Sequence, residues 1–115
     1  MATAAPASAE GAGTAGCTHY ANFRNTQVQI DNCPGQGASW SWIYTADGKD
    51  TLEANVYITF FDGSQASDWA YPGTGGNSKT YYHSDVRSIH ICEKYNIGWF
   101  PPVPAHTCSQ EYYLV

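Results

Sequence analysis

An aromatic stripe marks residues 38–44, which read ASWSWIY. Trp40, Trp42 and Tyr44 alternate with small or aliphatic residues, so on a β-strand the three rings share one face. Exposed aromatic rings recognise sugars and also act as hot spots for protein partners. The segment is therefore the first candidate for chemistry in this chain, as a platform that binds a ligand.

The same stripe also suits the interior of a β-sandwich. A tryptophan side chain buries about 150 Å² or more, which makes a core position its default. In this interpretation Trp42, at the centre of the strand, lies in the core between the sheets, and Trp40 lies near the solvent edge. Ser39, Ser41 and Ile43 then form the solvated face. We expect this core arrangement and keep the binding platform as the alternative.

Patterns for catalysis and metal binding are incomplete in this sequence. Residues 73–80, GTGGNSKT, resemble the phosphate-binding GxxxxGK[ST] loop, but Ser78 replaces the required glycine and strand-forming residues follow where a helix should begin. No spacing requires the acidic residues to converge as a glycosidase pair, and the histidines lack zinc-like spacing. These residues are Asp62, Asp68, Asp85 and Glu93, and His19, His83, His90 and His106. We therefore expect a binding protein with no enzymatic activity, cofactor or metal.

The four cysteines form two pairs with the same interval. Cys17 and Cys33 are sixteen positions apart, and so are Cys92 and Cys108. Four cysteines permit three disulfide connectivities, and the equal intervals favour sequential pairing, which closes two short loops. Each bridge would stabilise the fold by about 3 kcal/mol in the loop-entropy model. Two structural disulfides indicate an oxidising compartment.

Composition and charge narrow the function classes. Charged residues make up 13% of the chain and aromatic residues 15%, with 11 glycines and 6 prolines, which is typical of a β-rich extracellular protein. The net charge is −5, and the five basic residues are scattered, so nucleic-acid binding is not expected. No apolar run has the length of a membrane span. One domain, acting as a monomer, is expected from the 115 residues.

Residues 1–16 differ from the rest of the chain. Nearly all are small, and Ala-x-Ala patterns typical of signal-peptidase sites occur at 2–4 and 7–9 without the apolar segment that should precede them. We interpret the chain as a mature or near-mature secreted protein with Met1 added, the alternative being a flexible leader without meaning. Residues 1–16 are expected to be disordered, and residues 17–115 to form the domain.

Alternating apolar residues predict several short strands. Val28 and Ile30 share one face of 26–32, and Val56, Ile58 and Phe60 share one face of 54–61. Prolines at 101, 102 and 104 exclude a central strand over 97–107, and the tail EYYLV is interpreted as an edge strand. The remaining predicted strands are 18–24, 38–45, 66–71, 79–83 and 86–92. The pattern predicts an all-β fold, a small antiparallel sandwich or barrel tied by two disulfides.

From Cys17 to Cys92 the order of features resembles the tendamistat-type proteinaceous α-amylase inhibitors that actinobacteria secrete. The corresponding features here are Cys17, the turn Phe23-Arg24-Asn25, the approach Asp31-Asn32-Cys33, and a strand, a Tyr-Pro-Gly loop and a strand ending in Cys92. The resemblance implies a secreted, disulfide-tied β-sandwich that inhibits a glycosidase through this turn, with Arg24 as its charged anchor.

Two departures separate the chain from that family. The family turn is Trp-Arg-Tyr, whereas this chain has Asn25 in place of the third aromatic residue. The family's last cysteine pairs with a mid-chain cysteine, but here Trp69 lies near that place and Cys92 is left to pair with Cys108.

Two functions follow from these observations. The first is a secreted inhibitor that binds a hydrolase such as α-amylase through Phe23, Arg24 and Asn25. The second is a carbohydrate-binding module that holds a polysaccharide on its aromatic residues, which are Trp40, Trp42 and Tyr44, with Trp69 as a further binding residue. The two differ in whether the rings of the stripe are exposed in a row.

Overall fold

The computed structural model describes residues 17–33, 35–73, 80–98 and 101–114. These residues form nine strands and no helix. None of them belongs to a helix long and apolar enough to cross a membrane. The strands are β1 Thr18–Phe23, β2 Thr26–Asn32, β3 Ser39–Thr45, β4 Thr51–Phe60, β5 Gln65–Ala70, β6 Thr80–Tyr82, β7 Val86–Ile97, β8 Val103–Cys108 and β9 Tyr112–Tyr113.

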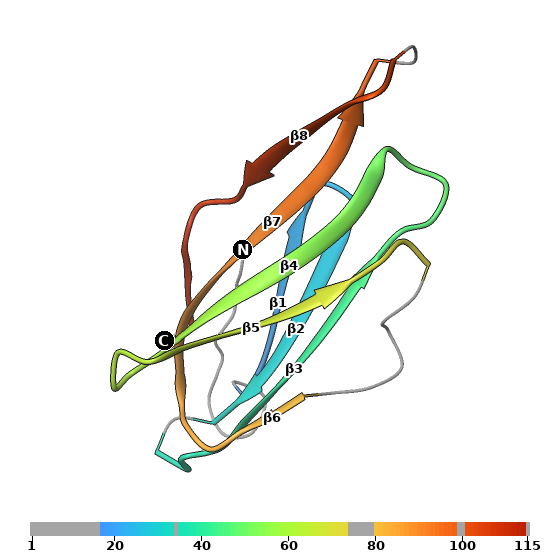
Figure 1. Cartoon of the computed structure of the whole chain (residues 1–115). Coiled ribbons are helices and arrows are strands. Elements are labelled where there is room, and N and C mark those ends of the chain that lie inside the picture. Colours follow the sequence, from blue (N-terminus) through green and yellow to red (C-terminus); the bar gives the residue numbers. More distant parts are fainter. Residues whose placement is uncertain (1–16, 34, 74–79, 99–100, 115) are drawn as a thin grey trace.

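The strands form two antiparallel sheets that lie one in front of the other (Figure 1). The first has the order β1-β2-β3-β6. It is called the front-hairpin sheet below because it contains the β1–β2 hairpin, which comes first in the chain order of the strands. The second has the order β5-β4-β7-β8, with β9 also paired to β7, and is called the long-strand sheet after β4 and β7. The prediction of an all-β antiparallel sandwich is confirmed.

The core lies between the inner faces of the two sheets. The alternation predicted for 26–32 and 54–61 is confirmed, because Val28, Ile30, Val56, Ile58 and Phe60 are all buried. Closely packed aliphatic side chains of this kind are the main source of stability in a domain of this size. The other buried apolar residues are Ala21, Ile43, Ala54, Ala70, Val86, Ile89, Ile91 and Leu114.

Both disulfides join neighbouring strands within one sheet, in the sequential pairing that the intervals predict. Cys17 bonds to Cys33 at the open end of the β1–β2 hairpin. Cys92 of β7 bonds to Cys108 of β8, which lies directly opposite in the register. Two disulfides are compatible with an extracellular location.

Two of the predicted strands are shorter than the observed ones. β4 begins at Thr51 and β7 continues to Ile97, so these two form the longest pairing in the fold. The proline-rich segment supplies only an edge strand, β8, as expected because proline lacks the N–H donor of a central strand. The tail supplies the short strand β9, which pairs with β7. Residues 1–16, expected to be disordered, and residues 74–79 of the phosphate-loop-like segment lie outside the described residues.

The predicted orientation of the aromatic stripe is wrong. Ser39, Ser41 and Ile43 of β3 are buried, whereas Trp40 is 39% exposed and Trp42 is only partly covered. The inner serines form hydrogen bonds inside the sandwich: the Ser39 hydroxyl donates to the Ser84 carbonyl at 2.8 Å, and Ser41 Oγ lies 2.8 Å from the Tyr82 hydroxyl. Satisfied hydroxyls lose little on burial, so this strand turns its small residues inward and its rings outward.

His19 gives the fold a pH dependence. Its Nε2 is buried and forms no hydrogen bond with the described residues, and burial lowers the pKa below 6.5, only partly offset by the Asn32 backbone and the charge of Asp31. As the pH falls through 6.5, His19 binds a proton in the unfolded chain but not yet in the folded chain. Stability should therefore fall from this pH downward to the lowered pKa of the folded state.

Urea denaturation of the parent and of His19→Leu at a series of pH values measures this effect. The unfolding free energy of the parent should decline more steeply on acidification than that of the variant. His83→Gln, which changes an exposed histidine, should follow the parent. Parallel curves for the parent and His19→Leu would contradict the assignment.

Candidate functional site

The outward rings of β3 belong to a larger aromatic face on the front-hairpin sheet. The register places Trp40 between Asp31 of β2 and Tyr81 of β6, and Trp42 beside Gln29. Gln29 in turn lies opposite Tyr20 of β1, and Tyr44 lies opposite Gln27. Residues opposite one another in antiparallel strands point to the same side. The aromatic face therefore consists of Tyr20, Trp40, Trp42, Tyr44 and Tyr81.

The rings of this aromatic face are accessible to different degrees. Tyr20 is 53% exposed, Tyr81 is 45% exposed, and Trp40 is 39% exposed, whereas Trp42 and Tyr44 are half-buried. Apolar rings exposed together on one side of a sheet are unusual for a monomeric protein and mark a site of interaction.

The rings along β3 have a regular arrangement. The ring planes of Trp42 and Tyr44 are within 15° of parallel, with centroids 6.2 Å apart. Trp40 contacts Tyr81 with centroids 5.0 Å apart at a tilt of 55°, and the Tyr81 ring meets the edge of His83 at 4.6 Å. These contacts across β3 and β6 fix the positions of the rings before any ligand arrives.

Polar side chains lie beside the rings on β2. Gln27, Gln29 and Asp31 occupy the positions opposite Tyr44, Trp42 and Trp40. Gln29 Nε2 donates to Asp31 Oδ1 at 3.0 Å, which orients both groups. Amides and carboxylates both form hydrogen bonds with hydroxyl groups, so the face combines stacking surfaces with polar partners for a polyhydroxylated ligand.

The strands under the aromatic face are held from within the sandwich. Asp68 of β5 accepts hydrogen bonds from Ser41 Oγ at 3.3 Å and from Thr80 Oγ1 at 2.8 Å, so it connects the opposite sheet to both β3 and β6. Asp85 accepts from the backbone N–H groups of Gly35 and Gly37 at 2.8 and 2.9 Å, at the entry to β3. These bonds restrain the loop before Trp40 and the strand that carries Tyr81.

The turn Phe23-Arg24-Asn25 is bound to the protein itself. Arg24 Nε donates to Glu93 Oε1 at 2.7 Å, and its Nη2 donates to Asp50 at 2.8 Å. The guanidinium lies 4.3 Å over the ring of Tyr95. The hydrogen bond to Glu93 raises the pKa of Arg24 further above its usual value, so the side chain stays charged. Arg24 therefore has three internal partners that an external target would have to displace.

The other two turn residues also contact the protein interior. Phe23 packs against the core. The Asn25 backbone N–H donates to Glu93 Oε2 at 3.0 Å, and its side-chain amide donates to Thr51 Oγ1 at 2.9 Å. Arg24 adopts a positive φ of 54°, which is uncommon for a residue with a side chain, and these bonds hold the turn in that conformation.

Trp69 lies on the other side of the molecule from the stripe. It sits on β5 opposite Asn55, on the outer face of the long-strand sheet, and is 56% exposed. The structure therefore brings Trp40, Trp42 and Tyr44 together and separates them from Trp69. The turn at Arg24 adjoins the Tyr44 end of the stripe, because the Asn25 carbonyl accepts hydrogen bonds from the Ala46 backbone N–H at 2.8 Å and from Thr45 Oγ1 at 3.2 Å. Tyr20 and Tyr81 are the members of the aromatic face that the sequence did not reveal. Tyr20 joins the face through Gln29 on the neighbouring strand β2, and Tyr81 through Trp40, which is distant in the chain.

The described part of the chain contains no group of three or more His, Cys, Asp or Glu side chains able to hold an ion. Comparison with known protein families, with curated proteins and with solved structures finds no match. The resemblance to tendamistat-type inhibitors stays a prediction from the sequence.

Proposed function

We propose that this small disulfide-bonded β-protein binds polysaccharide on the aromatic face of the front-hairpin sheet. The observation that carries the proposal is the outward orientation of Trp40, Trp42 and Tyr44, beside Tyr20 and Tyr81. A protein that needed these rings only for stability would bury them, since burial of an aromatic ring yields several kcal/mol.

The shape of the face favours a flat, extended polysaccharide. The rings of β3 occur at every second residue along one strand, and Tyr20 and Tyr81 widen the surface on either side. A β-1,4-linked chain presents the apolar faces of its sugar rings along a line, which matches this row. A helical α-linked glucan would curve away from a row of rings along one strand.

The charge of the protein favours a neutral ligand. The net charge is −5, and Asp31 lies directly beside Trp40. An anionic polysaccharide would meet repulsion both from the whole protein and at the site. Insoluble cellulose and chitin, which are neutral and flat, are the ligands that the proposal predicts.

Replacing Trp40 with alanine should remove most of this binding with little effect on stability. Trp40 is more exposed than Trp42 on this face, so the substitution deletes a stacking surface without opening a cavity in the core. We expect the parent to be retained on microcrystalline cellulose or chitin, and Trp40→Ala to show at least a tenfold weaker binding isotherm. Its unfolding free energy should stay within about 1 kcal/mol of the parent.

Tyr113→Ala is the matched control, because Tyr113 is an exposed aromatic residue on β9 of the other sheet. It should bind as the parent does. Failure of the parent to bind either solid, or equal binding of parent and Trp40→Ala, would overturn the proposal. Inhibition of a secreted α-amylase that is lost on Arg24→Ala would favour the inhibitor function instead.

A further inference from the structure

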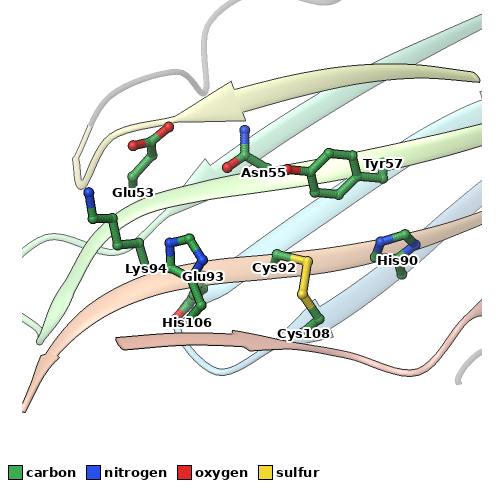
Figure 2. Close-up of a pocket in the computed structure, with 9 residues that line it drawn as sticks. All are labelled: Glu53, Asn55, Tyr57, His90, Cys92, Glu93, Lys94, His106 and Cys108. Atoms are coloured by element: carbon green, nitrogen blue, oxygen red, sulfur yellow. A yellow bond between two sulfur atoms is a disulfide. The ribbon is translucent and has the colours of Figure 1, made fainter. Parts of the chain in front are cut away.

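The outer face of the long-strand sheet contains a hollow of about 460 Å³. Its lining comes from β4, β7 and β8, and Figure 2 shows the side chains around it. The Cys92–Cys108 disulfide lies between the two ends of the hollow (Figure 2). Tyr57 and His90 form one end, and Glu53, Lys94 and His106 the other. The volume falls in the range of pockets that hold small ligands.

The register of the three strands produces this arrangement. Tyr57 lies opposite His90, Asn55 opposite Cys92, and Glu53 opposite Lys94. Cys108 and His106 of β8 extend the last two rows. Three cross-strand rows therefore follow one another along the sheet. The first is aromatic, the second contains the Asn55 amide and the disulfide, and the third contains the charged side chains of Glu53 and Lys94.

The aromatic end is preorganised. The ring planes of Tyr57 and His90 are within 22° of parallel, with centroids 5.1 Å apart, and Tyr57 is 41% exposed. His90 Nδ1 lies 3.0 Å from Glu111 Oε1, and the other oxygen of Glu111 accepts a hydrogen bond from Ser88 at 2.7 Å. This chain of contacts fixes the imidazole, so the pair forms a rigid wall.

The remaining lining offers both donors and acceptors. Glu53 accepts hydrogen bonds, Lys94 donates them, and Asn55 and His106 do both. Each hydroxyl of a sugar also donates and accepts, so a neutral sugar ring can pair with this mixture while its apolar face contacts Tyr57 or the disulfide. The opposite charges of Glu53 and Lys94 offset each other at that end, so this pair selects neither an anion nor a cation.

We infer that this hollow is a second saccharide site, which binds a short, soluble segment of neutral sugar chain. Trp69 extends the site, because it lies opposite Asn55 on β5 and faces the same side. The ligand class rests on the proposed function, but the residues are independent of the aromatic face. The two sites lie on opposite outer faces of the sandwich (Figure 1), so one molecule bridges two sugar chains.

Isothermal titration calorimetry with cellotetraose and chitotetraose tests the second site. The parent should bind at least one of these oligosaccharides, and Tyr57→Ala should weaken that binding at least tenfold. His106→Ala, on the exposed edge strand β8, should weaken it measurably without altering the fold, which a thermal melt verifies. The same loss should appear when Tyr57→Ala is introduced into Trp40→Ala, a background in which binding on the aromatic face is already weakened.

The outcomes separate the two proposals. The second site alone is overturned if the protein is retained on solid polysaccharide in a Trp40-dependent way, but neither Tyr57→Ala nor His106→Ala weakens oligosaccharide binding. Oligosaccharide binding that depends on Tyr57 and His106, without retention on solids, overturns the aromatic face alone. Polysaccharide-coated beads should be cross-linked by the parent only, and cross-linking by Tyr57→Ala would also contradict the second site.

Discussion

Replacing Glu93 with alanine is expected to destabilise the protein by about 3–5 kcal/mol, because it leaves the buried hydroxyls of Thr26 and Thr51 and the Asn25 N–H without their acceptor, at about 1–3 kcal/mol for each unsatisfied group. The Glu93 side chain has no exposed surface, and its carboxylate accepts hydrogen bonds from Arg24, Asn25, Thr26 and Thr51. These four donors come from the β1–β2 turn, from β2 and from β4, so the carboxylate of Glu93 on β7 connects the two sheets. Its removal leaves the Arg24 guanidinium with only the exposed Asp50 as an ionic partner.

Urea denaturation monitored by circular dichroism measures the loss. Asp50→Ala is the matched control, because it removes the exposed partner of the same Arg24 and should cost less than about 1 kcal/mol. Glu93→Gln keeps the shape but not the charge and should fall between the two. Equal stability of Glu93→Ala and Asp50→Ala would show that the buried carboxylate does not hold the sheets together.

Removing the Cys17–Cys33 disulfide in a Cys17→Ser/Cys33→Ser variant is expected to lower stability by about 3 kcal/mol, since the bridge closes a loop over a sequence separation of 16 in the unfolded chain. In the folded protein it joins the ends of β1 and β2, and β1 is an edge strand with a partner on one side only. Without the bridge, β1 should separate more readily from the sheet and expose the buried Ala21 and the core residues beside it.

The measurement is the urea midpoint of this variant, together with hydrogen exchange of the β1 amides. Exchange should accelerate in β1 more than in β4, which lies inside the long-strand sheet between β5 and β7. The reduced parent, which lacks both bridges, should be less stable than the variant. A variant as stable as the oxidised parent would contradict the prediction.

The strands and the disulfides could be predicted from the sequence because their signals are local. Alternation in NVYITFF identifies a half-buried strand, and equal cysteine intervals favour sequential bridges. Alternation divides a strand into two faces, but it does not decide which face is inside. For β3 that choice depends on Tyr82, Asp68 and Ser84, which form hydrogen bonds with the inner serines from 27 to 45 positions away.

The environment of Arg24 depends on distant contacts in the same way. The bonds from this turn to Glu93 connect residues 68 and 69 positions apart, and no short motif encodes them. The sequence therefore identified the turn as a candidate inhibitory element, while the fold supplies Arg24 with internal partners. The hollow beside Tyr57 also needs β4, β7 and β8 in register, which composition and periodicity do not provide.

Hydroxyl-radical footprinting of the protein on microcrystalline cellulose or chitin tests most directly whether the aromatic face binds polysaccharide. Oxidation of each aromatic residue is quantified by mass spectrometry in the free and bound protein, with Tyr113 as the internal reference. We expect Trp40 and Tyr81, both exposed in the free protein, to be protected at least severalfold on the solid, while Tyr113 oxidises at the same rate in both. Oxidation of Trp40 and Tyr81 at unchanged rates in the bound protein would contradict the proposed function.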